Sequence, residues 1–132
     1  LEAGIDPDSL EHNYMAPGDE HYRDIPSVLL ARIQNGVPRF DAVICGNDRI
    51  ALMVYQTLLA QGLRIPEDVA VIGYDNMVGI GELFLPPLST VQLPHYEIGR
   101  LSALHIINGE QHLETTRVES PYLKRDSVAH AS

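Results

Sequence analysis

The sequence predicts an α/β protein whose core is a doubly wound parallel sheet. Residues 42–45 and 69–72 are short apolar runs without polar interruption, which is typical of strands buried on both faces. Residues 49–61, which lie between them, have apolar side chains at helical spacing. A strand, a helix and a strand in this order form a right-handed crossover, and such units build the doubly wound class. The length of 132 residues is that of one domain.

A first helix is predicted between Asp24 and the pair Asn35-Gly36. Asp24 is a suitable N-cap, Pro26 is tolerated in a first turn, and Asn-Gly is typical of a helix end. Its apolar stripe consists of Ile25, Val28, Leu29 and Ile33.

Both predicted strands run into polar turns that contain glycine, residues 46–48 and 73–76. In doubly wound proteins, ligands bind beyond the carboxyl ends of the strands, so these two turns are the candidate rim of a binding site. The helix over residues 49–61 begins at the first turn, with Asn47 or Asp48 as its cap.

After residue 76 the alternation of apolar runs and amphipathic helices gives way to a loop and shorter elements. Glycines and prolines interrupt an apolar loop over residues 77–87. A short strand is expected over residues 89–92, a third helix over about 96–107 and a last strand over about 115–120. The tail, residues 129–132, is expected to be disordered.

Charge and motif content exclude several classes of function. Nine basic residues stand against eighteen acidic ones, and the basic residues are scattered, so this chain is not expected to bind nucleic acid. One cysteine excludes an internal disulfide, and six histidines show no metal-ligand spacing. Nucleophile, phosphate-loop and dinucleotide motifs are absent, so we expect no enzyme and no cofactor. Cys45, on a buried strand, is expected to be inert.

No apolar run approaches the roughly 20 residues that cross a bilayer, and the start of the sequence does not read as a signal peptide. Because nothing requires an oxidising compartment, a cytoplasmic location is expected.

Four segments carry a resemblance to a known family. Residues 40–48, FDAVICGND, resemble the "AVFCGND" segment of LacI/GalR-type transcription regulators, and residues 62–76, GLRIPEDVAVIGYDN, resemble their "GLRVPEDVSVIGYDN". Residues 86–91, PPLSTV, and residues 123–128, LKRDSV, are similar to the family's "PPLTTV" and closing "L..R.SV". The segments follow the family's order and nearly its spacing.

The resemblance implies a periplasmic-binding-protein-like fold of type I and a fragment of its C-terminal subdomain. Residues 1–88 would form most of that effector-binding subdomain, and residues 89–113 a crossover that packs on an N-terminal subdomain outside this chain. Residues 114–128 would return to the sheet. The first five residues, LEAGI, look like the end of the family's "AL.EAGI" helix, which implies that the helix-turn-helix headpiece and hinge lie outside the chain.

The function that the resemblance implies is that of an effector-binding and dimerisation module of a DNA-binding repressor. The effector would be a small molecule, a sugar or a related metabolite, and DNA would be bound only through the headpiece. The alternative is a periplasmic sugar-binding protein of the same fold that serves transport. The segments PPLSTV and LKRDSV favour the regulator.

Asp75 and Asn47 are the principal effector-binding candidates. The Asp75 carboxylate follows a buried strand and can accept two hydrogen bonds from sugar hydroxyls, and the family uses the aspartate of "GYD" in this way. The Asn47 amide can both donate and accept. The alternatives are a turn cap for Asp75 and a helix N-cap for Asn47, and Asp48 is interpreted as a cap or hinge residue.

Weaker candidates come from a looser similarity. Glu20 stands where the family's "GDF" or "GDW" has an aromatic residue that stacks on the ligand, and Tyr14 or Tyr22 could take that place. The resemblance also implies a homodimer through the helix over residues 49–61 and the following apolar loop. Its expected anchors, for which an intramolecular core is the alternative, are Ile50, Met53, Met77, Leu83 and Phe84.

Overall fold

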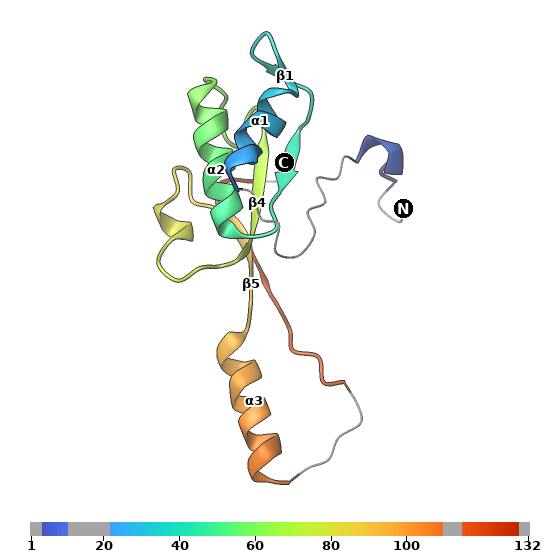
Figure 1. Ribbon diagram of the computed structural model, residues 1–132, viewed down its shortest axis with the longest axis vertical. Helices are drawn as coiled ribbons and strands as arrows, with labels where there is room; N and C mark the ends of the chain where they lie inside the picture. The colour runs from blue at the N-terminus through green and yellow to red at the C-terminus, as the bar shows by residue number, and fades with distance from the viewer. Residues whose placement is uncertain (1–3, 11–21, 110–114, 130–132) are drawn as a thin grey trace.

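The computed structural model describes residues 4–10, 22–109 and 115–129, and its centre is a four-stranded sheet (Figure 1). The strand order is β3-β4-β5-β6. β3, β4 and β5 are parallel, as the crossover pattern predicts, whereas β6 pairs antiparallel with β5. The four strands are β3 (Ala42–Ile44), β4 (Ala70–Asp75), β5 (Ser89–Gln92) and β6 (Tyr122–Leu123).

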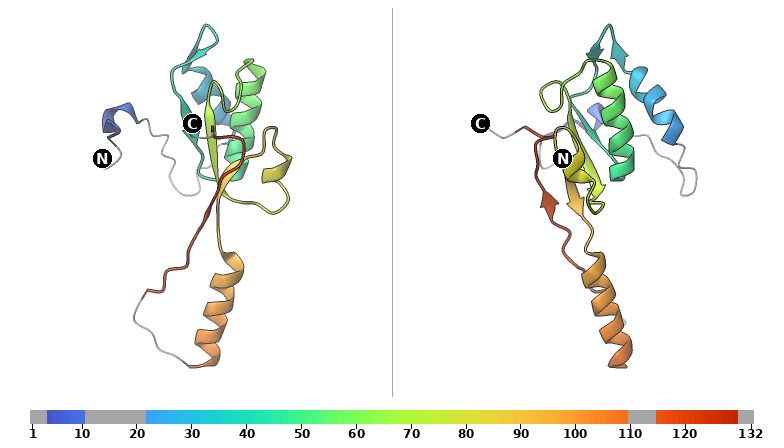
Figure 2. Two further views of the ribbon diagram at one scale, coloured as in Figure 1. Left: turned by 180° about the vertical axis from the view of Figure 1, so that it is seen from behind. Right: turned by 90° about the vertical axis from the view of Figure 1, so that its left-hand side faces the viewer.

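Two helices cover one face of this sheet, α1 (Ile25–Leu30) and α2 (Asp48–Ala60) (Figure 2). Val54 and Leu58 of α2 pack in the core with Val71 of β4, and all three side chains are excluded almost completely from solvent. Alternate strand residues point the other way, and Ile44 on that face is 79% exposed. The core therefore lies on the helical side of the sheet.

The third helix, α3 (His95–Ile107), projects away from the body (Figures 1 and 2). None of its residues is buried, and its side chains Tyr96 and Ile106 are 84% and 81% exposed. It begins one residue before the predicted start. The expectation that residues 89–113 pack on another subdomain stays a prediction.

The predicted first helix is wrong in its second half. α1 ends at Leu30, and a hairpin of β1 (Ile33–Gln34) and β2 (Val37–Pro38) follows. Asn35 and Gly36 form its two-residue turn with φ of 53° and 76°. Positive φ at both positions is the turn geometry that matches the twist of a hairpin, and Asn-Gly is the pair that best adopts it. The same dipeptide ends helices, so the local signal had two interpretations.

The predicted strand over residues 115–120 is also wrong, because the segment that pairs with β5 is Tyr122–Leu123. Beyond β6, the backbone of Ser127 bridges two parts of the fold. Its carbonyl accepts from Val71 N at 3.0 Å, and its N–H donates to Pro87 O at 3.1 Å. Short 3₁₀ helices occur at η1 (Pro7–Ser9), η2 (Tyr22–Asp24) and η3 (Gly81–Leu83).

Within the described parts of the chain, no helix combines the length and the apolar character that a membrane crossing requires.

Candidate effector site

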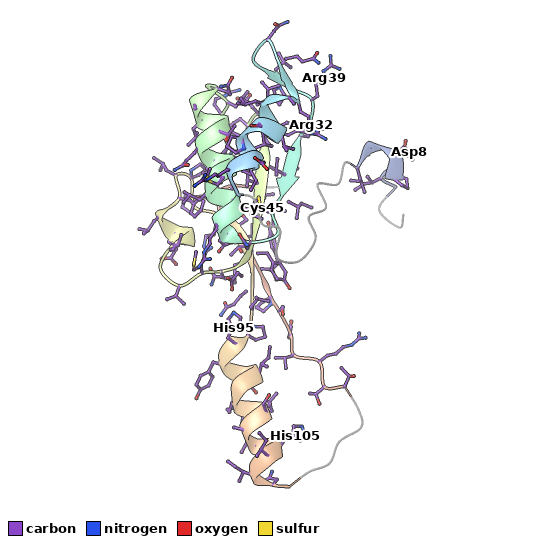
Figure 3. The ribbon with its side chains drawn as sticks, viewed as in Figure 1. Asp8, Arg32, Arg39, Cys45, His95 and His105 are labelled. Carbon is purple, nitrogen blue, oxygen red and sulfur yellow. The ribbon has the colours of Figure 1, made fainter. Side chains whose placement is uncertain are left out.

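Parallel pairing of β3 with β4 brings the polar turns after both strands to one edge of the sheet. This is the edge at which doubly wound proteins bind ligands. Asn47 follows β3 and Asp75 ends β4, so the two principal candidates belong to the same rim. His95, the first residue of α3, lies where the body meets that helix (Figure 3).

Asn47 is the N-cap of α2. Its backbone is extended, with φ of −161°, and its Oδ1 accepts a hydrogen bond from Ile50 N at 2.9 Å. This satisfies one of the N–H groups that a helix start leaves without a partner. The cap alternative is therefore confirmed for Asn47, and its contact with a ligand stays a prediction.

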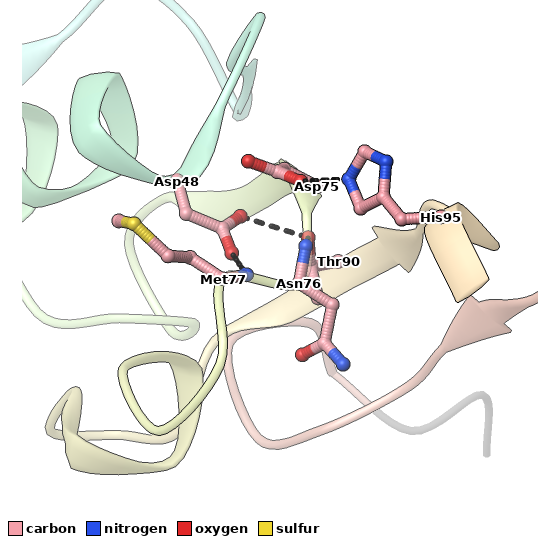
Figure 4. A network of polar contacts seen from close by, with 6 residues as sticks. All are labelled: Asp48, Asp75, Asn76, Met77, Thr90 and His95. Atoms are coloured by element: carbon pink, nitrogen blue, oxygen red, sulfur yellow. Dashed lines mark hydrogen bonds and ion pairs between the residues drawn. The ribbon is translucent and has the colours of Figure 1, made fainter. Parts of the chain in front are cut away.

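Asp48 is the central buried polar residue behind the rim, with 1% of its surface exposed. Its Oδ1 accepts from Thr90 Oγ1 at 2.8 Å, and its Oδ2 accepts from Met77 N at 2.9 Å (Figure 4). One carboxylate thus joins the start of α2 to β5 and to the loop after β4. The interpretation of Asp48 as a cap or hinge residue missed this role, because its partners are remote in sequence.

Gly73 makes room for this carboxylate. A Cβ at Gly73 would lie 2.2 Å from Asp48 Oδ1 and 2.8 Å from Leu88 Cδ2. Both distances are too short for real atoms, so only glycine fits there. A glycine inside a strand often marks a close approach of another group, and this was the one local signal for the buried carboxylate.

The backbone at the end of β4 is unusual for residues with side chains. Asp75 has φ of 109° and Asn76 has φ of 49°. Such conformations cost about 1–3 kcal/mol each and persist only where surrounding structure imposes them. Here Met77 N is bound by Asp48, and Asn76 N donates to Thr90 Oγ1 at 3.4 Å. The buried network therefore holds the backbone that directly follows Asp75.

Arg125 fixes the same loop from the C-terminal segment. Its Nη2 donates to Asn76 Oδ1 at 3.0 Å and its Nη1 donates to Leu88 O at 2.7 Å. Its backbone N–H donates to Ser89 Oγ at 2.8 Å. A Cβ at Gly81 would lie 2.7 Å from Arg125 Nη1, so the loop approaches the guanidinium closely. Arg125 was noted in the sequence only as part of the closing motif.

Asp75 has a side-chain partner that the sequence analysis did not anticipate. Its Oδ1 lies 3.2 Å from His95 Nε2, and the two side chains are 36% and 72% exposed, respectively (Figure 4). Because an ionised carboxylate only accepts, the hydrogen between the two atoms belongs to His95 Nε2. From the sequence, His95 was counted only among the six histidines that show no metal-ligand spacing.

The weaker candidates are Glu20, Tyr14 and Tyr22. Glu20 and Tyr14 lie outside the described residues. Tyr22 begins η2, but its side chain is not among those described.

The expected dimer anchors fall into two groups. Phe84 is 6% exposed and its ring packs edge-on against Tyr55, with centroids 4.8 Å apart and planes at 82°. The intramolecular alternative therefore holds for Phe84, and its place among the dimer anchors is corrected. Ile50 and Met53 are partly buried against the same core. By contrast, Leu83 is 81% exposed.

Further apolar side chains of the same loop are open to solvent. Val78 is 96% exposed and Leu85 is 81% exposed, and Met77 beside Val78 is partly buried. We call Val78, Leu83 and Leu85 the apolar loop surface. Of these three, only Leu83 is among the dimer anchors expected from the sequence.

Cys45 is buried at the end of β3, as expected, with 3% of its surface exposed. Burial, and then the charge of Asp48, raise the pKa of its thiol to about 12. A thiol with that pKa carries almost no thiolate at neutral pH. Among the described residues, no cluster of His, Cys, Asp or Glu side chains has the arrangement of a metal site.

Comparison with known proteins gives one family profile and several relatives. The profile described as "Periplasmic binding proteins and sugar binding domain of LacI family" matches residues 1–126. The sucrose operon repressors of Shigella flexneri and Escherichia coli are 55% identical over 127 residues, which is 96% of this chain and 38% of each relative. The ribose operon repressor of Haemophilus influenzae is 35% identical over 91 residues, 66% of this chain and 27% of that relative. The chain thus spans less than two fifths of these curated relatives.

Solved structures give the same picture of the fold. A LacI family transcriptional regulator from Enterococcus faecium with bound ribose has a TM-score of 0.64 and 31% identity, covering 82% of this chain and 39% of its own. A LacI family transcriptional regulator from Arthrobacter sp. FB24 has a TM-score of 0.68 and 28% identity, covering 83% and 41%. Each is similar in fold over more than four fifths of this chain.

Proposed function

The chain belongs to the family of periplasmic binding proteins and LacI-type sugar-binding domains, and on that premise we propose that it is part of the effector-binding and dimerisation module of a transcriptional repressor. Its α/β fold is the periplasmic-binding-protein-like fold of that family. The observation that carries the proposal is the 55% identity to the sucrose operon repressors over nearly the whole chain. The relatives reported above are named as repressors, so they give the transport alternative no support.

The proposed effector is a neutral sugar, and the proposed contact is the rim at the ends of β3 and β4. The Asp75 carboxylate is accessible and can accept hydrogen bonds from hydroxyl groups. Asn47 stands on the neighbouring strand end, where its amide N–H₂ could donate. Sucrose and its two constituent monosaccharides, glucose and fructose, are the first ligands to test, because of the names of the sucrose operon repressors reported above.

The proposed mechanism is a shift between conformations. A ligand that contacts this rim and a second subdomain favours one angle between the two, and a dimer relays that angle to DNA-binding headpieces. This chain supplies one wall of such a cleft. Its net charge of −9 and scattered basic residues agree with DNA contact by another part of the protein.

The proposed dimer contact is the apolar loop surface together with Met77. Exposed aliphatic side chains on a loop that Asp48 and Arg125 hold in place provide a rigid apolar patch. Ile50 and Met53 can contribute only their accessible parts, since both also contact the core.

The effector proposal is tested by calorimetric titration of the full-length protein with sucrose, glucose and fructose. Saturable binding of at least one sugar is expected. Asp75→Asn should weaken it tenfold or more, because a charged acceptor is replaced by a neutral amide. Asp126→Asn, the same change at an exposed position, is the control. Absence of binding by all three sugars contradicts the proposal.

The dimer proposal is tested by light scattering on the same protein. Leu83→Asp should raise the dimer dissociation constant strongly, since it places a charge in the apolar patch. Val37→Asp, at a side chain 64% exposed on the β1–β2 hairpin, should leave it unchanged. Equal dissociation constants for the two variants would exclude the loop as the contact.

A further inference from the structure

The segment from Asp75 to Val78 connects the two surfaces to which the proposed function assigns binding. Asp75, at its start, is the proposed effector contact, and its side chain is 36% exposed. Val78, at its end, belongs to the apolar loop surface and is 96% exposed. Between them the chain has only Asn76 and Met77. A change of backbone conformation at Asn76 or Met77 therefore alters how the two surfaces stand relative to each other.

The backbone of this segment has a conformation that residues with side chains rarely adopt. Asp75 and Asn76 have φ of 109° and 49°. Positive φ is unfavourable for such residues and persists only where the surrounding structure imposes it. Strained residues of this kind gather at ligand clamps and at switch regions. An ordinary backbone at these two positions is the form that competes with the observed one.

Two buried side chains hold the segment in the strained conformation (Figure 4). Asp48 Oδ2 accepts from Met77 N at 2.9 Å, and Thr90 Oγ1 accepts from Asn76 N at 3.4 Å. The Thr90 hydroxyl in turn donates to Asp48 Oδ1 at 2.8 Å, and these two residues are 0% and 1% exposed. Arg125 Nη2 adds a bond to Asn76 Oδ1 at 3.0 Å. Because the bond between Asp48 and Thr90 is shielded from water, it is well placed to offset the strain.

We propose that the Asp75–Val78 segment is a conformational switch shared by the effector rim and the dimer contact, and that the Asp48–Thr90 pair sets its population. In the held form, both positive φ values and the bonds to Asn76 N and Met77 N are present. In the relaxed form they are lost, and neither surface is ready to bind. The inference rests on the proposed function and adds its regulation, since sugar and a second subunit each select the held form and so favour one another.

The two affinities then depend on one quantity, the fraction of the chain in the held form. The apparent dissociation constant for sugar rises as the inverse of that fraction. The dimer dissociation constant rises as the inverse square, because both subunits must be held. Saturating sugar returns each subunit to the held form and removes the dimer defect. Two surfaces without a shared switch do not show this rescue.

The experiment uses the full-length protein, with calorimetric titration of whichever of sucrose, glucose and fructose binds the wild type and light scattering for the dimer. Thr90→Val removes the hydroxyl at similar size, and Thr90→Ser keeps it. Thr57→Val is the matched control, because the Thr57 hydroxyl is also buried but donates to Met53 O of its own helix, α2, at 2.8 Å. Asp48→Asn is a second weakening variant, whose amide nitrogen cannot accept from Met77 N.

Thr90→Val should raise the sugar dissociation constant about fivefold and the dimer dissociation constant about 25-fold, and saturating sugar should restore the dimer constant to within about twofold of wild type. Asp48→Asn should show the same paired loss and the same rescue, which keeps the test decisive if one variant does not fold. Thr90→Ser and Thr57→Val should stay within about twofold of wild type in both constants. Leu83→Asp should lose the dimer without rescue by sugar, since its defect lies at the contact itself.

The outcomes separate this inference from the proposed function. Loss of one affinity without the other in Thr90→Val, or a dimer defect that saturating sugar does not repair, overturns the shared switch and leaves the effector site and the dimer contact standing. Wild-type constants in both Thr90→Val and Asp48→Asn, or an equal effect of Thr57→Val, overturn it as well. Failure of all three sugars to bind the wild type rejects the proposed function, and the switch with it.

Discussion

The buried carboxylate of Asp48 accepts a hydrogen bond of 2.8 Å from the hydroxyl of Thr90, a residue 42 positions away in sequence. The two side chains are 1% and 0% exposed, so water does not compete for the bond. Since Asp48 also binds Met77 N, one carboxylate ties the start of α2, the loop after β4 and β5 into one hydrogen-bonded unit. Every side chain proposed to touch the effector is attached to this unit.

Asp48→Ala should lower the free energy of unfolding by about 3 kcal/mol, because it leaves Met77 N–H and the Thr90 hydroxyl buried without an acceptor. Urea unfolding followed by circular dichroism measures this. Asp41→Ala removes a carboxylate from an exposed position and should change stability by less than about 0.5 kcal/mol. A similar effect of both variants would show that Asp48 does not hold the rim together.

Gly73→Ala should be strongly destabilising, by about 2–3 kcal/mol, because its Cβ would lie 2.2 Å from Asp48 Oδ1. Gly99→Ala is the matched control: it lies in α3, where an added methyl group would meet nothing within 4 Å, and should be neutral or slightly stabilising. The measurement is the thermal unfolding midpoint of each variant, which should fall for Gly73→Ala and not for Gly99→Ala. Equal midpoints would mean that the carboxylate moves aside without cost.

Asn47 has two separable roles, a helix cap and a proposed ligand contact. Asn47→Ala should cost about 1 kcal/mol of stability by removing the acceptor for Ile50 N. Asn47→Ser keeps a capping oxygen and should retain most of that stability, but it lacks the amide donors. A sugar affinity reduced in both variants would support ligand contact by the amide. Wild-type affinity in the serine variant would restrict Asn47 to capping.

Cys45 should react with a disulfide reagent only after unfolding, because its thiol is buried and its pKa is about 12. The unfolded thiol releases its proton at lower pH than the folded one, so its contribution to stability is complete below about pH 9 and is lost as pH rises toward 12. Cys45→Ala should therefore flatten the alkaline fall in stability. Tyr55, whose pKa burial also raises to about 12, should account for part of the remainder.

The parallel core could be predicted from sequence because its signals are local. Uninterrupted apolar runs correspond to β3 and β4, residues 89–92 form β5, and Asn47 caps α2 as its position suggests. The prediction of a helix end at Asn35-Gly36 was wrong because this dipeptide suits both a helix end and a hairpin turn. Only the pairing of Ile33 with Pro38, which the dipeptide does not reveal, distinguishes the two.

Only part of the candidate site could be predicted from the sequence. Asp75 could be named because it follows a buried strand at a ligand-binding edge. Its partner His95 and the Asp48 carboxylate depend on contacts across 20, 29 and 42 residues, which no local pattern specifies. Phe84 was misassigned because an apolar side chain on a loop can face either way, and its contact with Tyr55 turns it inward.

The contacts of Arg125 impose an order on biosynthesis. Asn76 Oδ1 and Leu88 O are translated 49 and 37 residues before the guanidinium that binds them. While a ribosome is still making the intervening chain, β3, α2 and β4 can already associate and Asp48 can bind Met77 N, but the contacts that Arg125 makes to Asn76 and Leu88 are still missing. A chain that stops before Arg125 would therefore hold that loop through Asp48 alone, and the full set of contacts would form only after residues 123–128 have been made.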